Sequence, residues 1–232
     1  MKTKGLSQEA LKLIACITML IDHVGIALVP HGEALYYVCR CIGRLAFPIY
    51  CFLLVEGMRH TRKPEKYILR LSIGTLLAEL PFDVLFNGGI SWNSQSEMVT
   101  LTLGAVMLLC MEKTEKKWLK LLIVLPFAIL ANLAKTDYRA GGIVMIAVFG
   151  LLDQWTLQTA ALFLVNWQML PSAAVEVFDI VIILQLLATF AMIPIACYSG
   201  EKLTRSRAIQ WGFYLFYPAH LLILWLILGL IR

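Results

Sequence analysis

Residues 7–29 read SQEALKLIACITMLIDHVGIALV, an apolar stretch long enough to cross a lipid bilayer as a single helix. A helix rises about 1.5 Å per residue and the hydrocarbon core is about 30 Å thick, so roughly 20 residues are enough. Ser7 opens the stretch and is a favoured N-cap residue. Lys2 and Lys4 precede it, as in a signal peptide, but the apolar run continues without a small-residue cleavage site. We therefore predict a retained first transmembrane helix.

The whole chain has the composition of a membrane protein. Of its 232 residues, 60% are hydrophobic and 15% are charged, whereas soluble domains are about 45–50% apolar and about 25% charged. The available polar groups are too few to cover this much apolar surface in water, which excludes an ordinary soluble domain. Helices of about 20 residues with short loops fill the length. We predict one integral membrane domain over residues 1–232.

Eight further apolar stretches follow the first, at 38–58, 66–86, 98–112, 118–134, 140–153, 156–170, 178–198 and 208–231. The stretches at 140–153 and 156–170 are short for spanning helices, and together they also fit one broken or re-entrant element. The expected count is therefore about nine, with a range of eight to ten. The predicted fold class is all-α, a polytopic transmembrane helix bundle.

The lysines and arginines of the loops define an orientation for this bundle, because cytoplasmic loops carry an excess of them. If nine helices alternate, most of these residues fall on the side of the N-terminus: Lys2, Lys4, Arg59, Arg62, Lys63, Lys66, Lys113, Lys116, Lys117, Lys120, Lys202, Arg205 and Arg207. The other side holds Lys135, Arg139 and Arg232. We predict a cytoplasmic N-terminus. The net charge of +5 follows this topology, so membrane lipids are the expected partners and nucleic acid is not.

Ionisable side chains inside spanning helices are costly and mark either a function or a buried pair. Lys12 and His23 share the first helix and are 11 positions apart. At about 100° per residue they lie within about 20° of one helix face, separated by about 16 Å along the axis. A long ligand that enters from the cytoplasm would meet the ammonium group first and the imidazole deeper in the bilayer.

Each of these charged or polar residues also has a purely structural explanation. A histidine in a membrane helix often hydrogen-bonds to a neighbouring helix, which applies to His23 and His220. Lys12 and Arg70 lie near predicted cytoplasmic ends and can extend to the interface. Arg44 lies deeper and would need a buried partner.

Two carboxylates are expected to pair with basic residues. Glu56 can neutralise Arg59 or His60, which follow it by three and four positions. Asp22 adjoins His23 in sequence and therefore faces away from it on a helix, so we expect it to pair with Arg44 or with another helix. The six cysteines lack zinc-ligand spacing and are expected to be buried apolar residues. No metal is expected.

Several motifs occur in an order that resembles the TraX family, named after a membrane protein that acetylates the N-terminus of a conjugative pilin. They are LKLIA (11–15), MLIDH (19–23), GRLAFP (43–48), EG (56–57), YILRL (67–71), ELPFD (79–83), DY (137–138) with Gly142, and FYPAHL (216–221). The resemblance extends over nearly the whole chain. The family in turn looks related to the wider transmembrane acyltransferases, in which a basic residue often precedes the histidine by the spacing seen between Lys12 and His23.

This resemblance implies an enzyme that takes an acyl group, acetyl above all, from acyl-CoA in the cytoplasm and delivers it to an amine or hydroxyl outside. A multi-pass protein of the bacterial inner membrane is implied as well. The implied catalytic residues are His23, His220 and Asp22; the implied acyl-CoA-binding residues are Lys12, Arg44 and Arg70; the implied substrate or structural supports are Glu56, Tyr217 and Asp137. Either histidine can be the general base. The acceptor is left open among a peptide, a glycan, a lipid and a small molecule, and a homo-oligomer is possible.

Two other functions use the same residues. A small transporter or channel would use the intramembrane charges as a proton or ion pathway, with helix breaks at Pro48, Pro81, Pro194 and Pro218. Such transporters usually have paired broken segments in two similar halves, which the sequence does not have. In a non-catalytic membrane assembly factor, the polar residues would only specify how the helices pack.

Overall fold

The computed structural model describes residues 5–169, 184–203 and 206–231. These residues are helical or irregular, apart from the isolated β-bridges Leu6–Tyr198 and Gln95–Thr136, so the all-α prediction is confirmed. Some of the predicted features lie outside the described residues: Lys2, Lys4, Arg205, Arg232, the last residue of 156–170 and the first part of 178–198.

The helices follow one another with short connections. They are α1 (Gln8–Leu28), α2 (Ala34–Gly43), α3 (Ala46–His60), α4 (Pro64–Phe82) continued by the π-helical turn η1 (Asp83–Asn87), α5 (Glu97–Glu112), α6 (Lys117–Leu133), α7 (Arg139–Leu151), α8 (Trp155–Gln168), the 3-10 turn η2 (Ala188–Ala191), α11 (Met192–Ala196) and α12 (Arg207–Ile231). If α2 is counted with α3, and η2 with α11, the described residues form nine helical segments. This count agrees with the sequence prediction.

The main difference from the prediction lies in the second helix. The expected helix at 38–58 begins earlier and is divided into α2 and α3, with Arg44 and Leu45 at the break. Pro48 is the third residue of α3. Proline is tolerated in a first turn because the amide it lacks would have no helical partner there. The proline thus favours a new helix start just before it, which a hydrophobicity pattern alone does not reveal.

Three helical segments among the described residues are long and apolar enough to cross a membrane, by length and composition: Gln8–Leu28, Ala34–His60 and Ala208–Ile231. Two shorter apolar helices are Arg139–Leu151 and Leu184–Ala196. The described fold is therefore a helix bundle of the kind found in membrane proteins.

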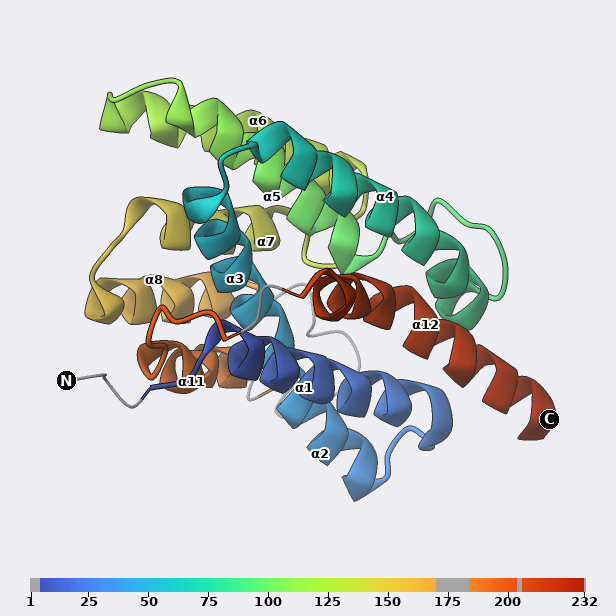
Figure 1. Ribbon diagram of the computed structural model, residues 1–232. Helices are drawn as coiled ribbons and strands as arrows, with labels where there is room; N and C mark the ends of the chain where they lie inside the picture. The colour runs from blue at the N-terminus through green and yellow to red at the C-terminus, as the bar shows by residue number, and fades with distance from the viewer. Residues whose placement is uncertain (1–4, 170–183, 204–205, 232) are drawn as a thin grey trace.

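α3 runs through the middle of the bundle and packs against α1, α5 and α7, while α12 lies between α1 and α4 (Figure 1). Fully buried side chains such as Phe47, Ile49, Met107 and Phe149 form the core around α3. The first and last helices of the chain therefore lie side by side, which places His23 and His220 on facing surfaces.

Contacts near the helix termini show which segments lie together at each end of the bundle. Three of these contacts are the Leu6–Tyr198 bridge, the Arg59–Asp153 ion pair and the Gln95–Thr136 bridge. The first two join segments that the charge pattern assigns to the cytoplasmic side, and the third joins segments assigned to the opposite side. The alternation predicted from lysine and arginine positions thus agrees with the connectivity of the fold.

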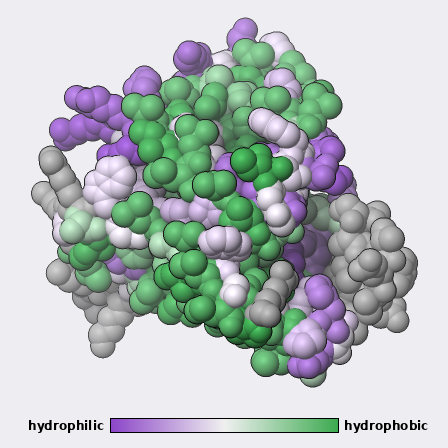
Figure 2. All heavy atoms as spheres, turned by 90° about the vertical axis from the view of Figure 1, so that its right-hand side faces the viewer, coloured by the Kyte–Doolittle hydropathy of each residue, from purple (hydrophilic) through white to green (hydrophobic). Residues whose placement is uncertain are grey.

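The outer surface of the bundle is strongly apolar. On α4, exposed large side chains recur at helical spacing at Leu69, Ile73, Leu76 and Leu80, and α6 and α12 carry similar rows. Figure 2 shows hydrophobic side chains over much of the face it presents, with hydrophilic ones toward the margin. Apolar area on this scale exceeds what soluble monomers expose, and it suits contact with lipid.

Glycines allow α1 and α2 to approach closely. A Cβ added to Gly25 would lie 2.4 Å from the Cβ of Cys39, and one added to Gly43 would lie 2.2 Å from the Cγ of Asp22. Small residues at such crossings are the usual means of close packing between membrane helices.

Gly25→Ala is therefore expected to lower the melting temperature of the detergent-solubilised protein, because overpacking costs about 1–3 kcal/mol. The matched control is Gly212→Ala in α12, where an added Cβ meets nothing within 4 Å. There the substitution should be neutral or stabilising, since alanine favours a helix over glycine by about 1 kcal/mol. Equal melting temperatures for the two variants would contradict the close α1–α2 contact.

Candidate active site

A cavity of about 420 Å³ lies between α1, α3, α4, α5 and α12. Gln8, Thr61 and Lys202 line it at the end of the bundle predicted to face the cytoplasm, and Glu97 and Tyr217 line it farther in. Its volume falls within the range of about 300–1,000 Å³ typical of small-molecule sites. The cavity therefore has the size of a binding site and leads from one end of the bundle toward its interior.

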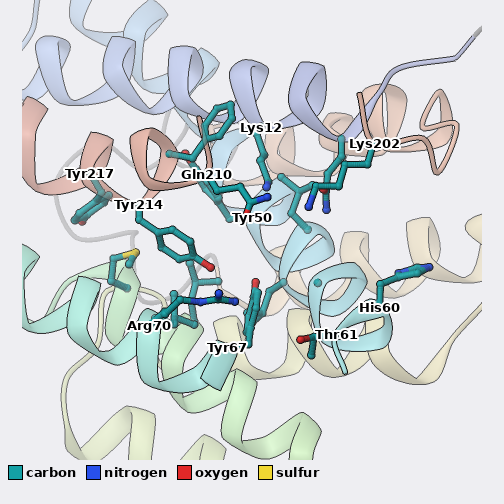
Figure 3. A pocket seen from close by; sticks show the side chains of 18 of the residues that line it. Lys12, Tyr50, His60, Thr61, Tyr67, Arg70, Lys202, Gln210, Tyr214 and Tyr217 are labelled. Carbon is teal, nitrogen blue, oxygen red and sulfur yellow. The ribbon is translucent and has the colours of Figure 1, made fainter. Parts of the chain in front are cut away.

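Three cationic side chains from different elements surround the outer part of the cavity. Lys12 and Lys202 reach into it from one side and Arg70 from the other (Figure 3). The Lys12 ammonium lies 5.4 Å from the ring centroid of Phe213, and the Arg70 guanidinium lies 6.0 Å from that of Tyr67. Within the described part of the chain, none of the three forms a salt bridge with a carboxylate. Converging cations that form no salt bridge favour the binding of an anion such as phosphate, although the Glu9 carboxylate lies within electrostatic range of Lys12.

α1 and α12 bring two buried histidines into direct contact. His23 Nδ1 lies 2.7 Å from His220 Nε2, and the two side chains are 4% and 5% exposed. Their ring planes differ by 4° and their centroids are 5.0 Å apart, which fits a hydrogen bond in the plane of both rings. His220 Nδ1 lies 2.8 Å from the carbonyl oxygen of Phe216.

These contacts determine the tautomer of each neutral imidazole. A carbonyl oxygen only accepts, so the proton of His220 is on Nδ1, which donates to Phe216. His220 Nε2 is then the acceptor and receives a hydrogen bond from His23 Nδ1. His23 Nε2 is then unprotonated and carries a lone pair. In this arrangement His23 offers the basic nitrogen, and His220 orients its ring and stabilises the charge that it would acquire.

Tyr217 connects the cavity with the histidine pair. It lines the cavity, and its ring makes edge contacts with both His23 and His220, at centroid distances of 6.1 and 5.5 Å. Phe86 contacts the ring of His23 at 5.4 Å. His23 itself does not line the cavity, so Tyr217 is the side chain through which a ligand in the cavity would approach the pair.

Asp22 pairs with α2. Its Oδ2 accepts a hydrogen bond from Arg40 Nη1 at 2.6 Å, which agrees with the expectation of a partner on another helix. Arg44 lies within electrostatic range of Asp22, Asp137 and Glu97. Its guanidinium donates a hydrogen bond to Gln185 at 3.3 Å and does not line the cavity, unlike Lys12 and Arg70.

Asp22→Asn is expected to destabilise the protein by about 3–5 kcal/mol, because it leaves the guanidinium of Arg40 largely buried without its counter-charge. Thermal unfolding in detergent measures this loss. The double variant Asp22→Asn with Arg40→Met should recover much of it, since both charges are then removed. A stable single variant with lost activity would instead assign Asp22 a direct chemical role.

The remaining predicted residues, Glu56 and Asp137, do not line the cavity, although Asp137 lies within electrostatic range of Glu97 and Tyr217. Glu56 contacts Arg59 at 3.8 Å and His60 at 3.7 Å, as its spacing suggests. Asp137 is exposed in the connection between α6 and α7, where its amide donates to the carbonyl of Gln95 at 3.0 Å. Both positions fit structural support at opposite ends of the bundle.

The structure adds residues that sequence reasoning did not single out. Lys202, Glu97, Gln210 and Tyr214 all line the cavity. Gln210, Tyr214 and Tyr217 recur at intervals of four and three, so they share one face of α12. That polar and aromatic row in an otherwise apolar helix is a signal present in the sequence. Glu97, directly before the predicted helix at 98–112, gives no comparable signal.

Together these features define a class: a helical membrane protein with a cationic cavity that leads toward a buried histidine pair. Comparison with known proteins then identifies the family. The TraX protein family matches residues 7–228, and the chain belongs to this family.

Relatives of the chain come from several bacteria. The chain is 28% identical over 226 residues to a probable fimbrial assembly protein FimC, serogroup H1, of Dichelobacter nodosus, covering 92% of each chain. It is 24% identical over 222 residues to Protein TraX of Escherichia coli, covering 94% of this chain and 85% of the relative. A shorter match, 33% over 86 residues, joins 37% of this chain to 31% of the uncharacterized protein RP591 of Rickettsia prowazekii. No solved structure matches.

Proposed function

We propose that this protein is a multi-pass acyltransferase of the bacterial inner membrane, which transfers an acyl group, acetyl above all, from cytoplasmic acyl-CoA to an acceptor amine or hydroxyl at the outer side. One observation carries the proposal. The cavity begins among Lys12, Arg70 and Lys202 and ends at Tyr217, whose ring contacts the hydrogen-bonded pair of histidines.

The chemistry of the cavity fits acyl-CoA. This co-substrate has several phosphate charges at one end, a long pantetheine arm and a thioester at the other end. The cations at the mouth match the phosphates, and the apolar side chains Leu53 and Leu101 line the walls along which the arm would extend. The depth of the cavity would bring the thioester to Tyr217 and the histidine pair.

The tautomers of His23 and His220 define how the two histidines would take part in acyl transfer. His23 Nε2 takes the proton of the acceptor as the acceptor attacks the thioester carbonyl, and the positive charge on His23 is stabilised because its Nδ1–H points at the lone pair of His220 Nε2. The C–S bond then breaks, and the proton held by His23 passes to the departing thiolate. The products are the acylated acceptor and free CoA, and the histidine pair returns to its starting state.

The acceptor is not identified by these residues. One relative bears the name of a fimbrial assembly protein, so a surface-filament subunit is a reasonable first acceptor to test, next to glycans, lipids and small molecules. The same name also favours a second candidate function, a membrane assembly factor without catalysis.

The test uses purified protein in detergent with radiolabelled acetyl-CoA. Binding of acetyl-CoA, followed by slow hydrolysis or transfer to an added amine or hydroxyl, is the expected result. Absence of any acetyl-CoA binding would overturn the proposal and leave the assembly factor as the better explanation. If acetyl-CoA is bound and turned over, mass spectrometry of wild-type and deletion strains, compared for products that differ by an acetyl mass, would identify the acceptor.

A further inference from the structure

Five tyrosines line the cavity, and they differ in what surrounds their hydroxyl groups: Tyr50, Tyr67, Tyr198, Tyr214 and Tyr217. The hydroxyl of Tyr50 contacts Cys16 Sγ at 3.2 Å. Tyr67 and Tyr214 lie beside the Arg70 guanidinium at the cationic end (Figure 3). Tyr217 lies away from that end, and among the described residues its buried hydroxyl has no hydrogen-bond partner.

An unpartnered hydroxyl in this position is unfavourable unless a ligand uses it. Tyr217 is 5% exposed, and a buried donor that is left unsatisfied destabilises the fold. The Ser96 hydroxyl lies near Tyr217 but outside hydrogen-bonding geometry with the Tyr217 hydroxyl, and it donates its own proton to Glu79. Because no described residue offers an acceptor in hydrogen-bonding geometry, the Tyr217 O–H can donate to an oxygen atom that enters the cavity.

The packing of Tyr217 holds this donor beside the proposed base. Tyr217 precedes His220 by three positions on α12, which places both on one helix face, and its ring contacts both imidazoles. A donor fixed in advance near the reacting atoms stabilises developing negative charge without having to reorient during the reaction.

We propose that Tyr217 is a catalytic residue that donates a hydrogen bond to the thioester carbonyl oxygen. As the acceptor amine or hydroxyl forms its new bond to the carbonyl carbon, the electron pair of the C=O bond moves onto the carbonyl oxygen, and that oxygen accepts a hydrogen bond from the Tyr217 O–H. When the C–S bond breaks, the electron pair returns and the carbonyl forms again. Tyr217 keeps its proton throughout, and His23 carries the proton of the acceptor to the leaving thiolate. This inference rests on the proposed acyl transfer.

The test is Tyr217→Phe, which keeps the ring contacts and removes only the hydroxyl. We expect kcat to fall about 100-fold, the usual effect of removing one such donor, with little change in KM for acetyl-CoA. Affinity for free CoA, which has no thioester carbonyl, should be unchanged. The melting temperature should stay the same or rise, because the substitution removes an unsatisfied buried group.

Two further tyrosine-to-phenylalanine variants serve as controls for Tyr217→Phe. Tyr37→Phe in α2, outside the cavity, should leave kcat and KM unchanged. Tyr67→Phe at the cationic end should affect KM rather than kcat. Wild-type kcat in Tyr217→Phe would overturn the role proposed for Tyr217 while leaving acyl transfer intact. If the wild-type protein itself has no turnover with acetyl-CoA, the proposed function fails first.

Discussion

His23→Ala is expected to lower kcat for acyl transfer about 1,000-fold, within the range of about 10²–10⁴ that a general base contributes. The substitution removes the Nε2 lone pair of the histidine pair and leaves the cationic mouth of the cavity unchanged. Stopped-flow or single-turnover assays with labelled acetyl-CoA measure the rate. Free CoA should still raise the melting temperature of the variant, because bound ligand stabilises the folded state.

The same geometry predicts that the two histidines are unequal. His220→Ala should lower kcat by about 100-fold, less than His23→Ala, because it removes the group that orients and stabilises the base rather than the base itself. His31→Ala, at an exposed histidine in the loop between α1 and α2, should behave like the wild type. A larger loss in His220→Ala than in His23→Ala would reverse the assignment of the two roles.

Reversing the charges at the cavity mouth is expected to weaken the binding of acetyl-CoA strongly. The combined substitutions Lys12→Glu, Arg70→Glu and Lys202→Glu are expected to raise KM for acetyl-CoA about 1,000-fold or more, because each charge-assisted hydrogen bond to phosphate contributes about 1.5–3 kcal/mol. The rate of the chemical step at saturation should change little. Lys66→Glu, on the same side of the bundle but outside the cavity lining, is the matched control and should leave KM near its wild-type value.

The donor molecule itself supplies a sharper control for this prediction. Acetylpantetheine has the same thioester and arm as acetyl-CoA but lacks the phosphates. Wild type and the triple variant should therefore use acetylpantetheine with similar KM values. Added salt should raise the KM of the wild type for acetyl-CoA and leave its KM for acetylpantetheine unchanged. If the triple variant loses acetylpantetheine as well, the cations support the fold rather than bind phosphate.

Much of the helical architecture follows from the sequence because hydrophobic length is a local property. The structure places α1 at Gln8–Leu28 and α12 at Arg207–Ile231, within one residue of the predictions at each end. The division of α2 from α3 was not predicted, because hydrophobicity continues across Gly43 and Arg44 and does not show that Pro48 favours a new helix start just before it.

The site could be predicted only in part, for a related reason. The spacing of Lys12 and His23 shows that they share a face, because both lie on one helix. The hydrogen bond between His23 and His220 joins positions 197 residues apart, and no periodicity within one helix reports such a contact. Lys202 was recognisable as a loop charge, but its approach to Lys12 depends on how the segment before α12 runs across the start of α1.

The pairing of the first and last helices has a consequence for biosynthesis. Ribosomes deliver α1 to the membrane before α12, so His23 has no His220 beside it until α12 has been made. The mouth is also incomplete until then, because Lys202 and Tyr214 follow nearly all of the other helices. A chain that terminates early would insert into the membrane with neither a paired base nor a complete anion site. If the proposed acyl transfer holds, unfinished copies would therefore be unable to use acyl-CoA.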